Sequence, residues 1–178
     1  MKIIAICGSP RKGNTEFILK RILTKLEEQG HQVRLILLRE KKIKFCDGCL
    51  SCNETGKCKL RDDMQTIYPR LEESDLIIFG SPNYFSNVSG MMKNFFDRLL
   101  PFYYGKKLKD KKAVAAVVGA SDKVETIKRS TDYIKTAADL LKISFIGDFY
   151  LMARENNEVE NNPDSIKKID EFAENLAE

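Results

Sequence analysis

Four of the five cysteines in this chain lie within one stretch of thirteen residues, CDGCLSCNETGKC. They follow the spacing C-x2-C-x2-C-x5-C and are Cys46, Cys49, Cys52 and Cys58. Three thiolates within seven residues, with a fourth close behind, can bind the corners of an iron–sulfur cubane from a single loop, and a bacterial ferredoxin motif begins with the same spacing. Two nearby glycines give the backbone the freedom that such a loop needs. The spacing therefore favours a cluster site.

Two other uses of these cysteines stay open. A structural zinc ion accepts four thiolates, although zinc sites more often use two separated C-x2-C pairs. Free or redox-active thiols are the third interpretation of the same pattern. The fifth cysteine, Cys7, ends a short apolar run, and we expect it to be a small buried apolar residue.

A second motif whose residues could bind a ligand is the loop CGSPRKGNT at positions 7–15. It nearly matches the phosphate-binding pattern G-x-x-x-x-G-K-[ST], but Asn14 stands at the lysine position. Amide groups at a helix start and the hydroxyls of Ser9 and Thr15 suit a phosphate, while Arg11 and Lys12 add positive charge. Without the lysine, a nucleoside triphosphate loses its main outer contact. The loop predicts a terminal phosphomonoester site; the alternative is an ordinary turn without a ligand.

The chain contains one histidine, His31, which stands before an apolar run. Serine and cysteine hydrolase triads need an imidazole base, so a lone residue in this position argues against them. It also argues against the usual metal sites that use two histidines. The absence of side chains for general acid–base catalysis is expected in an enzyme whose bound cofactor carries the chemistry.

The elements that position these motifs alternate along the chain. Short apolar runs predict five strands over residues 2–7, 32–38, 75–81, 113–121 and 143–152. Amphipathic patterns predict five helices: over 14–29 with Asn14 or Thr15 as cap, from Asp62 or Asp63 through Leu71, around Met92–Leu99, from Val124 to Leu141 and from Asn162 onward. Within these, we expect Pro69 to kink or shorten the second helix, the third to stop before Pro101, and Val124 to be buried.

This alternation predicts an α/β fold of flavodoxin type, a doubly wound parallel sheet of five strands in the order 2-1-3-4-5. We expect one domain over residues 1–178, with a cysteine-rich loop at 46–58. Thirty basic residues face twenty-six acidic ones, so the net charge of +4 gives no nucleic-acid footprint. No run approaches the length of a membrane span, and no signal peptide is evident. We therefore expect a cytoplasmic protein whose thiols are reduced.

Three motifs together resemble the NADPH-dependent FMN reductase family and its flavodoxin-like relatives. They are GSPRKGNT after the first strand, SPNYFSNVSGMMKNFFDR after the third and VVGAS after the fourth. The resemblance reaches to about residue 150 and implies that the bound phosphate belongs to FMN. The residues that it places around this phosphate are Ser9, Arg11, Asn14 and Thr15, with Lys12 nearby.

The same resemblance places the isoalloxazine ring against the loop after the third strand. The residues expected to line it are Pro82, Asn83, Tyr84 and Phe85, with Gly119 close to the opposite side of the flavin. Two aromatic residues in a polar loop are unusual unless they pack on something flat, although they could instead anchor the loop in the core. No protein residue is expected to be catalytic, because the flavin carries the chemistry.

The cysteine spacing on such a chain resembles the iron-sulfur flavoproteins, which carry FMN and a [4Fe–4S] cluster. This implies an electron-transfer oxidoreductase that passes electrons from a ferredoxin-like donor to a small acceptor. It also implies a homodimer or homotetramer in which the cysteine loop of one subunit approaches the flavin of another. The alternative is a cluster-free NAD(P)H-dependent reductase of flavins or quinones. A third hypothesis is a nucleotide-binding switch, against which Asn14 counts.

Overall fold

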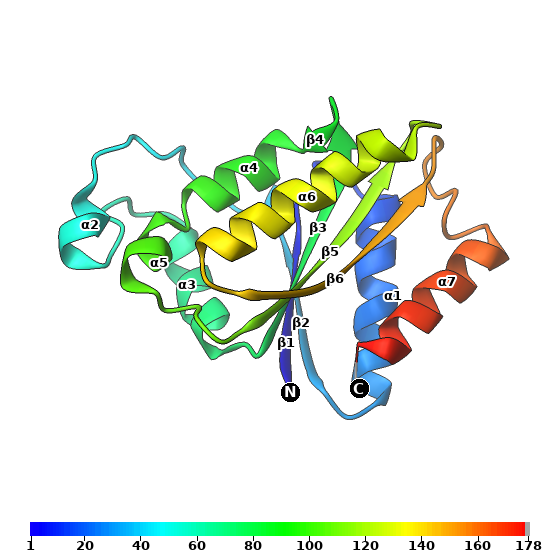
Figure 1. Ribbon diagram of the computed structural model, residues 1–178, viewed down its shortest axis with the longest axis horizontal. Helices are drawn as coiled ribbons and strands as arrows, with labels where there is room; N and C mark the ends of the chain where they lie inside the picture. The colour runs from blue at the N-terminus through cyan, green and yellow to red at the C-terminus, as the bar shows by residue number, and fades with distance from the viewer. Residues whose placement is uncertain (177–178) are drawn as a thin grey trace.

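A parallel sheet forms the centre of the computed structural model, which describes residues 1–176. Its strands are β1 (Lys2–Cys7), β2 (Gln32–Leu37), β3 (Leu76–Tyr84), β5 (Lys112–Gly119) and β6 (Ser144–Met152). They run in the order β2-β1-β3-β5-β6, and a two-residue strand, β4 (Asn87–Val88), pairs antiparallel with the end of β3. Numbered without β4, this is the predicted order 2-1-3-4-5. The predicted flavodoxin-like α/β fold is therefore confirmed (Figure 1).

Helices cover both faces of the sheet. The helices α1 (Asn14–Glu28) and α7 (Pro163–Asn175) pack on one face, where their apolar residues share a core with β1, β3 and β5. The other face carries α3 (Met64–Glu73), α4 (Gly90–Asp97) and α6 (Val124–Leu140). Because both faces are covered, the central strands are almost continuously buried, which explains their unbroken apolar sequences.

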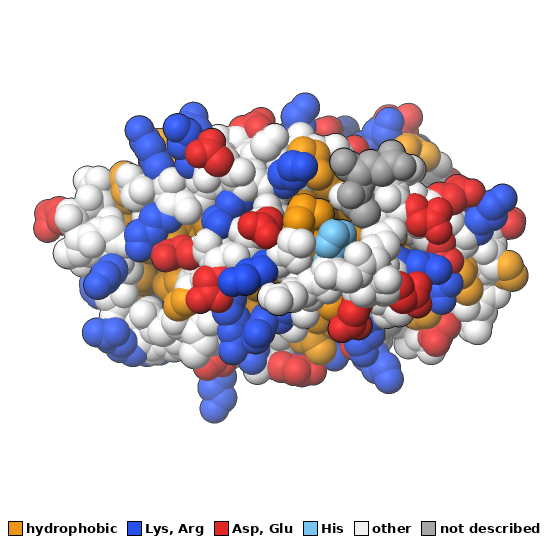
Figure 2. Space-filling view, turned by 90° about the horizontal axis from the view of Figure 1, so that it is seen from below, with side chains coloured by type: hydrophobic (Ala, Val, Ile, Leu, Met, Phe, Trp, Pro, Cys, Tyr) orange, Lys and Arg blue, Asp and Glu red, His pale blue; other side chains and the backbone are white. Residues whose placement is uncertain are grey.

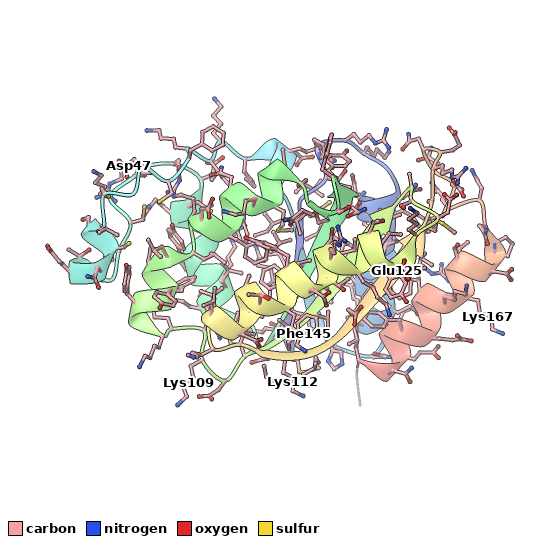
Figure 3. All side chains as sticks on the ribbon, turned by 45° about the horizontal axis from the view of Figure 1, so that its top comes forward. Asp47, Lys109, Lys112, Glu125, Phe145 and Lys167 are labelled. Carbon is pink, nitrogen blue, oxygen red and sulfur yellow. The ribbon has the colours of Figure 1, made fainter. Side chains whose placement is uncertain are left out.

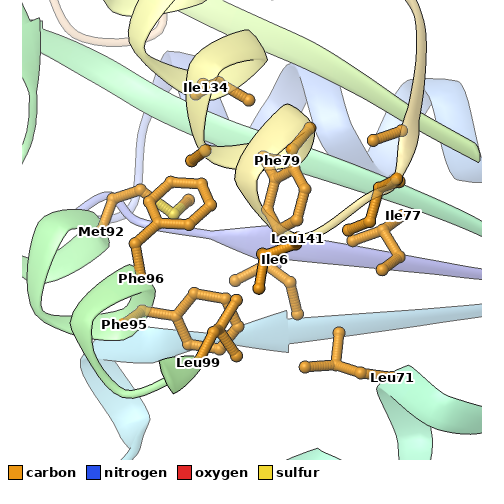
Figure 4. Close-up of a cluster of buried hydrophobic side chains, with 14 of the residues drawn as sticks. Ile6, Leu71, Ile77, Phe79, Met92, Phe95, Phe96, Leu99, Ile134 and Leu141 are labelled. Carbon is orange, nitrogen blue, oxygen red and sulfur yellow. The ribbon is translucent and has the colours of Figure 1, made fainter. Parts of the chain in front are cut away.

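The larger core lies beneath α3, α4 and α6. Phe79 of β3 packs on Phe96 of α4 with ring centroids 5.0 Å apart, and Ile134 of α6 lies nearby (Figure 4). On the opposite face, β3 and α1 come into close contact at Gly80, where an added Cβ would lie 2.5 Å from Leu19 Cδ1. This contact fixes α1, and with it the loop at its start, against the middle of the sheet.

Three short helices lie outside the predicted set. They are the 3-10 helix η1 (Leu38–Glu40), α2 (Ser51–Thr55) within the cysteine segment, and α5 (Leu100–Gly105). Pro101 lies in the first turn of α5, where a helix needs no N–H group, so the proline starts a new helix after α4 has ended.

The expected burial of Val124 was wrong: it is 37% exposed because it is the first residue of α6 and lies outside its buried face. The helix α3 continues past Pro69 to Glu73, so the proline does not shorten it, and a kink there stays a prediction. The last helix begins as predicted, since Asn162 accepts a hydrogen bond from the Ser165 N–H at 3.0 Å.

The surface at the amino ends of the strands carries no segregated charge. Basic and acidic side chains are interspersed over this face (Figure 2), as the near balance of charges predicts. His31 lies at this end, with its Nδ1 atom 3.2 Å from the amino group of Met1, remote from the carboxyl ends of the strands. Among the residues described, no helix is long and apolar enough to cross a lipid bilayer.

Candidate cofactor-binding site

Three loops meet at the carboxyl edge of the sheet. The strands β1, β3 and β5 are parallel neighbours, so the segments that follow Cys7, Pro82 and Gly119 emerge side by side. The Gly8 N–H donates to the carbonyl of Gly80 at 2.7 Å, which joins the first of these loops to β3. The sequence-predicted flavin residues all lie on these loops or on the strand ends beside them. In such sheets this edge is where ligands bind.

The first loop leaves the start of α1 without a side-chain cap. Gly13 is the N-cap residue, and neither Asn14 nor Thr15 caps the helix, contrary to the prediction. Ser9 and Thr15 are buried, whereas Arg11 and Lys12 are exposed. An uncapped helix start presents amide donors and the positive end of the helix dipole, which is a favourable environment for an anion.

The loop owes its shape to internal hydrogen bonds. The Ser9 hydroxyl donates to the Arg11 carbonyl at 2.8 Å and faces the Arg11 N–H at 3.4 Å. The Asn14 amide is committed elsewhere: it donates to the Glu155 carbonyl at 2.8 Å and accepts from the Val159 N–H at 3.2 Å. Asn14 therefore ties the loop to the segment before α7, although the resemblance implied a phosphate contact.

Sequence reasoning missed a buried carboxylate at this site. Glu16, in the first turn of α1, contacts Lys20 at 2.8 Å and Arg39 of η1 at 2.7 Å. Burial raises the pKa of Glu16, but the bonds to Lys20 and Arg39 outweigh this effect and hold the pKa below its usual value. The two cations also neutralise a charge that would repel an anion bound at the helix start. The Glu16–Lys20 spacing of four residues was the available signal.

The second loop is a tight β-hairpin. Tyr84 pairs with Asn87, which leaves Phe85 and Ser86 as a two-residue turn with φ angles of 50° and 59°. Positive φ at both positions defines a type I′ turn, for which Asn-Gly is the preferred sequence. The Phe85 side chain is fully exposed and Tyr84 is partly exposed, so Phe85 does not anchor the loop in the core. A large aromatic ring is thus presented on a strained turn.

Ser89, a residue that sequence reasoning also missed, connects the hairpin to the loop after β1. Its hydroxyl donates to the Gly8 carbonyl at 2.6 Å and accepts from the Met92 N–H at 3.1 Å, which caps α4. Gly8 must be a glycine here, because an added Cβ would lie 2.7 Å from Met92 Cβ. A serine directly before the α4 pattern was the signal for this cap.

The end of β5 packs closely against the same hairpin strand. A Cβ added at Gly119 would lie 3.0 Å from Asn83 Cβ and 2.9 Å from Ile127 Cγ1. The Asn83 side chain accepts a hydrogen bond from Ser130 of α6 at 2.7 Å, and Pro82 is buried beside it. The structure therefore brings Pro82, Asn83 and Gly119 together, with the exposed aromatic turn beyond them.

The four cysteines line a single small hollow that is partly open to solvent. Cys46 and Cys49 are exposed, Cys58 is half-buried and Cys52 is buried, and none forms a disulfide. Burial raises the pKa of Cys52, and the three neighbouring cysteines raise it further. These four residues lie in the extended segment around α2, near Asp47 in Figure 3.

Four thiols around one hollow are a donor set that suits a [4Fe–4S] cluster and also a structural zinc ion. Within residues 1–176, no three histidine, cysteine, aspartate or glutamate side chains lie close enough to bind one metal ion. Zinc needs its thiolates within about 2.3 Å of one atom, whereas a cubane takes one thiolate at each corner.

The comparisons with known proteins agree with this geometry. Residues 1–158 match the family model of NADPH-dependent FMN reductase. An iron-sulfur flavoprotein of Archaeoglobus fulgidus is 34% identical over 180 residues, which cover 100% of this chain and 80% of that protein. An iron-sulfur flavoprotein of Methanocaldococcus jannaschii is 42% identical over 122 residues, or 68% of this chain and 63% of that protein.

Solved structures support the fold. The NAD(P)H:quinone oxidoreductase from Methanothermobacter marburgensis superimposes with a TM-score of 0.80 at 15% identity, covering 100% of this chain and 96% of that one. An FMN-dependent NADH-azoreductase from Bacillus anthracis gives a TM-score of 0.69 at 16% identity over 100% of both chains. With the family match, these findings show that the chain belongs to the NADPH-dependent FMN reductase family of FMN-dependent oxidoreductases and, within it, to the iron-sulfur flavoproteins.

Proposed function

We propose that this protein is an electron-transfer flavoprotein that binds FMN and a [4Fe–4S] cluster and passes electrons from a ferredoxin-like donor to a small acceptor. The observation that carries the proposal is the convergence of all four cysteines on one hollow, in a chain whose flavin-type loops meet at the edge of the sheet. The protein acts as a single cytoplasmic domain, where reducing conditions keep the four thiols available as ligands.

The flavin site follows from the loops at the sheet edge. The phosphate binds at the uncapped start of α1, with Ser9, Thr15, Arg11 and Lys12 around it and Asn14 bracing the loop. The ring lies against the hairpin, whose residues Pro82, Asn83, Tyr84 and Phe85 line one side, while Gly119 lies near the other. When bound, FMN supplies one- and two-electron redox chemistry, and the protein binds and orients it without a catalytic side chain.

Cys46, Cys49, Cys52 and Cys58 hold the cluster, which supplies one-electron transfer when bound. Within one chain, α2 projects at one end of the molecule, well away from the β3–β4 hairpin (Figure 1). Phe45 and Leu50 expose apolar side chains in the cysteine segment, and Phe85 does so on the hairpin. These features support a homodimer or homotetramer in which one subunit's cysteine segment meets another subunit's hairpin.

The second candidate is a cluster-free reductase that uses NAD(P)H to reduce a flavin or quinone at the same FMN site. Family membership supports a nicotinamide partner for this reaction. Exposure of Cys46 and Cys49 also favours it, because surface thiols can remain free.

Anaerobic purification followed by iron, sulfide and flavin analysis separates the two. Four iron and four sulfide per FMN, with an EPR signal on reduction, is the expected result. Cys49→Ala should lose iron while keeping FMN, and Cys7→Ala, in the buried core, serves as the matched control that keeps both. Full iron content in the Cys49 variant would contradict the ligand assignment. A protein that binds no FMN would contradict the whole proposal.

A further inference from the structure

A buried ion pair lies directly beneath the cysteine segment. The guanidinium of Arg98, just past the end of α4, contacts the Asp62 carboxylate through Nη1 at 2.5 Å and Nη2 at 3.3 Å. The Arg98 side chain is 0% exposed and that of Asp62 is 3% exposed. Arg98 is the largest fully buried side chain among the described residues, which is unusual for a residue type that normally reaches solvent.

The ion pair joins both ends of the cysteine segment to α4. Arg98 Nη1 donates to the Lys44 carbonyl at 2.8 Å, just before Cys46. Asp62, just after Cys58, accepts from the Lys44 N–H at 2.9 Å and from the Met64 N–H at 3.0 Å, which starts α3. The two charged residues thus fix the base of the loop that carries the cysteines.

Arg98 also contacts a cysteine directly. Its Nη2 atom lies 3.5 Å from Cys58 Sγ, within hydrogen-bond distance for sulfur. The Tyr68 hydroxyl donates to the Arg98 carbonyl at 2.6 Å and holds that backbone in place. Other charges at the hollow come from Asp97 and from the Asp47–Lys59 pair, which lies at an exposed position. Arg98 is therefore the buried cation that faces a cysteine sulfur.

Stability alone does not account for this arrangement. A buried ion pair is often no more stabilising than apolar residues of the same volume. Here the Arg98 Nε atom also lacks a hydrogen-bond partner, so the pair is incompletely satisfied. N–H donors and positive charge beside cluster sulfurs, by contrast, favour the reduced cluster and orient its ligands. The position of Arg98 fits this second role.

We propose that Arg98, held by Asp62, is a positioning residue that fixes the Cys58 sulfur as a cluster ligand and stabilises the charge of the electron that a one-electron donor adds. This inference rests on the proposed function, since it concerns the cluster that the four cysteines hold. The inference also gives α4 a role: this helix begins just after the hairpin and ends next to Arg98, so it connects the proposed flavin site to the cysteine segment.

The test replaces the pair without leaving a buried charge. Arg98→Met combined with Asp62→Asn keeps one amide oxygen available for the backbone donors and removes both charges. The matched control is Arg21→Met with Asp170→Asn, because Arg21 and Asp170 form a bidentate pair with both contacts at 2.6 Å between α1 and α7, on the other face of the sheet. Both double variants are purified anaerobically and titrated redox-potentiometrically with EPR detection, and their thermal unfolding is followed.

We expect the Arg98/Asp62 variant to bind less iron per FMN than wild type. Its remaining cluster should be reduced at a potential lower by about 60 mV, which is a tenfold change in a one-electron equilibrium. The control should match wild type in both. Arg98→Lys, which keeps the charge but loses the planar fork, covers the case in which the double variant fails to fold, and it should retain most of the wild-type potential.

Each contrary outcome has a distinct meaning. A wild-type protein without iron overturns the proposed function and this inference together. A cluster-bearing wild type whose potential and iron content are unchanged in the Arg98/Asp62 variant overturns the inference alone. An Arg98→Lys protein with a potential shifted as far as that of the neutral variant contradicts the role of the positive charge. An equal shift of the cluster potential in the Arg21/Asp170 control would contradict a specific role of Arg98, because it would show that any loss of protein stability changes the potential.

Discussion

The hairpin turn at Phe85 and Ser86 leads to a prediction that links stability to flavin binding. Both residues adopt positive φ, which costs a residue with a side chain about 1–2 kcal/mol, whereas Asn tolerates this conformation and Gly adopts it freely. The Phe85 ring is fully exposed, so its removal sacrifices no burial. Replacing Phe85 with Asn and Ser86 with Gly should stabilise the flavin-free protein by about 2 kcal/mol, or roughly 4–8 °C in Tm.

The same change should weaken FMN binding, because it removes the ring that we propose packs on the flavin. An aromatic contact contributes about 0.5–1.5 kcal/mol beyond its buried area, which corresponds to a dissociation constant roughly 2–13 times higher. Thermal unfolding of the flavin-free protein and fluorescence titration with FMN measure the two effects. Lys142→Gly, at another exposed residue with positive φ (61°), is the control that should gain stability without any change in FMN affinity.

Two results would refute this reasoning. A flavin-free variant no more stable than wild type would show that the turn is not strained. Unchanged FMN affinity would show that Phe85 does not line the ring, and the exposed aromatic residue would then have to serve contacts between subunits alone.

Two further predictions concern α1. Thr15→Val removes a buried hydroxyl from the proposed phosphate site and should weaken FMN binding by about 1–3 kcal/mol, as titration would show; an unchanged affinity contradicts the placement of the phosphate. The Arg21 guanidinium holds the pKa of Asp170 below its usual value, so this pair stabilises the folded state above pH ~4 and the effect is lost as the pH falls further. Asp170→Asn should therefore cost about 0.5–1 kcal/mol at pH 7 and progressively less in denaturation below pH 4, and a cost independent of pH argues against the ion pair.

The sheet was predictable from sequence because its central strands are buried on both faces. Strands such as β1 and β3 are continuous apolar runs, so their positions follow from local sequence. The strand order was predicted from the alternation of strands and helices, which is typical of the flavodoxin fold. The short helices α2 and α5 form within loops and are too short to show an apolar periodicity in the sequence. Pro101 illustrates this: its sequence marks a boundary, but only the structure shows a helix starting there.

The motifs place the loops after β1 and β3 at the same edge of the sheet, and the structure has them there, but the hydrogen bonds within these loops were not predictable. That their residues hold FMN stays a prediction. The partners of Asn14 are 141 and 145 residues further along the chain, and no local pattern connects them. In the sequence, nothing marks Arg98 as buried. Its carboxylate partner, Asp62, lies 36 residues earlier, in a segment from which only a helix start was predicted.

The polar segment before α7 has a role that its composition conceals. In sequence it resembles a surface connection, yet its Glu155 carbonyl and Val159 N–H bind the Asn14 side chain, and Asn156 packs against Gly13. α7 then packs along α1 and joins it through the Arg21–Asp170 pair. The amide donors at the start of α1 are consequently held in place by the segment before α7, before any ligand arrives. A loop ordered in this way loses little further conformational entropy when an anion binds, so the C-terminal segment should contribute to FMN affinity without touching the flavin.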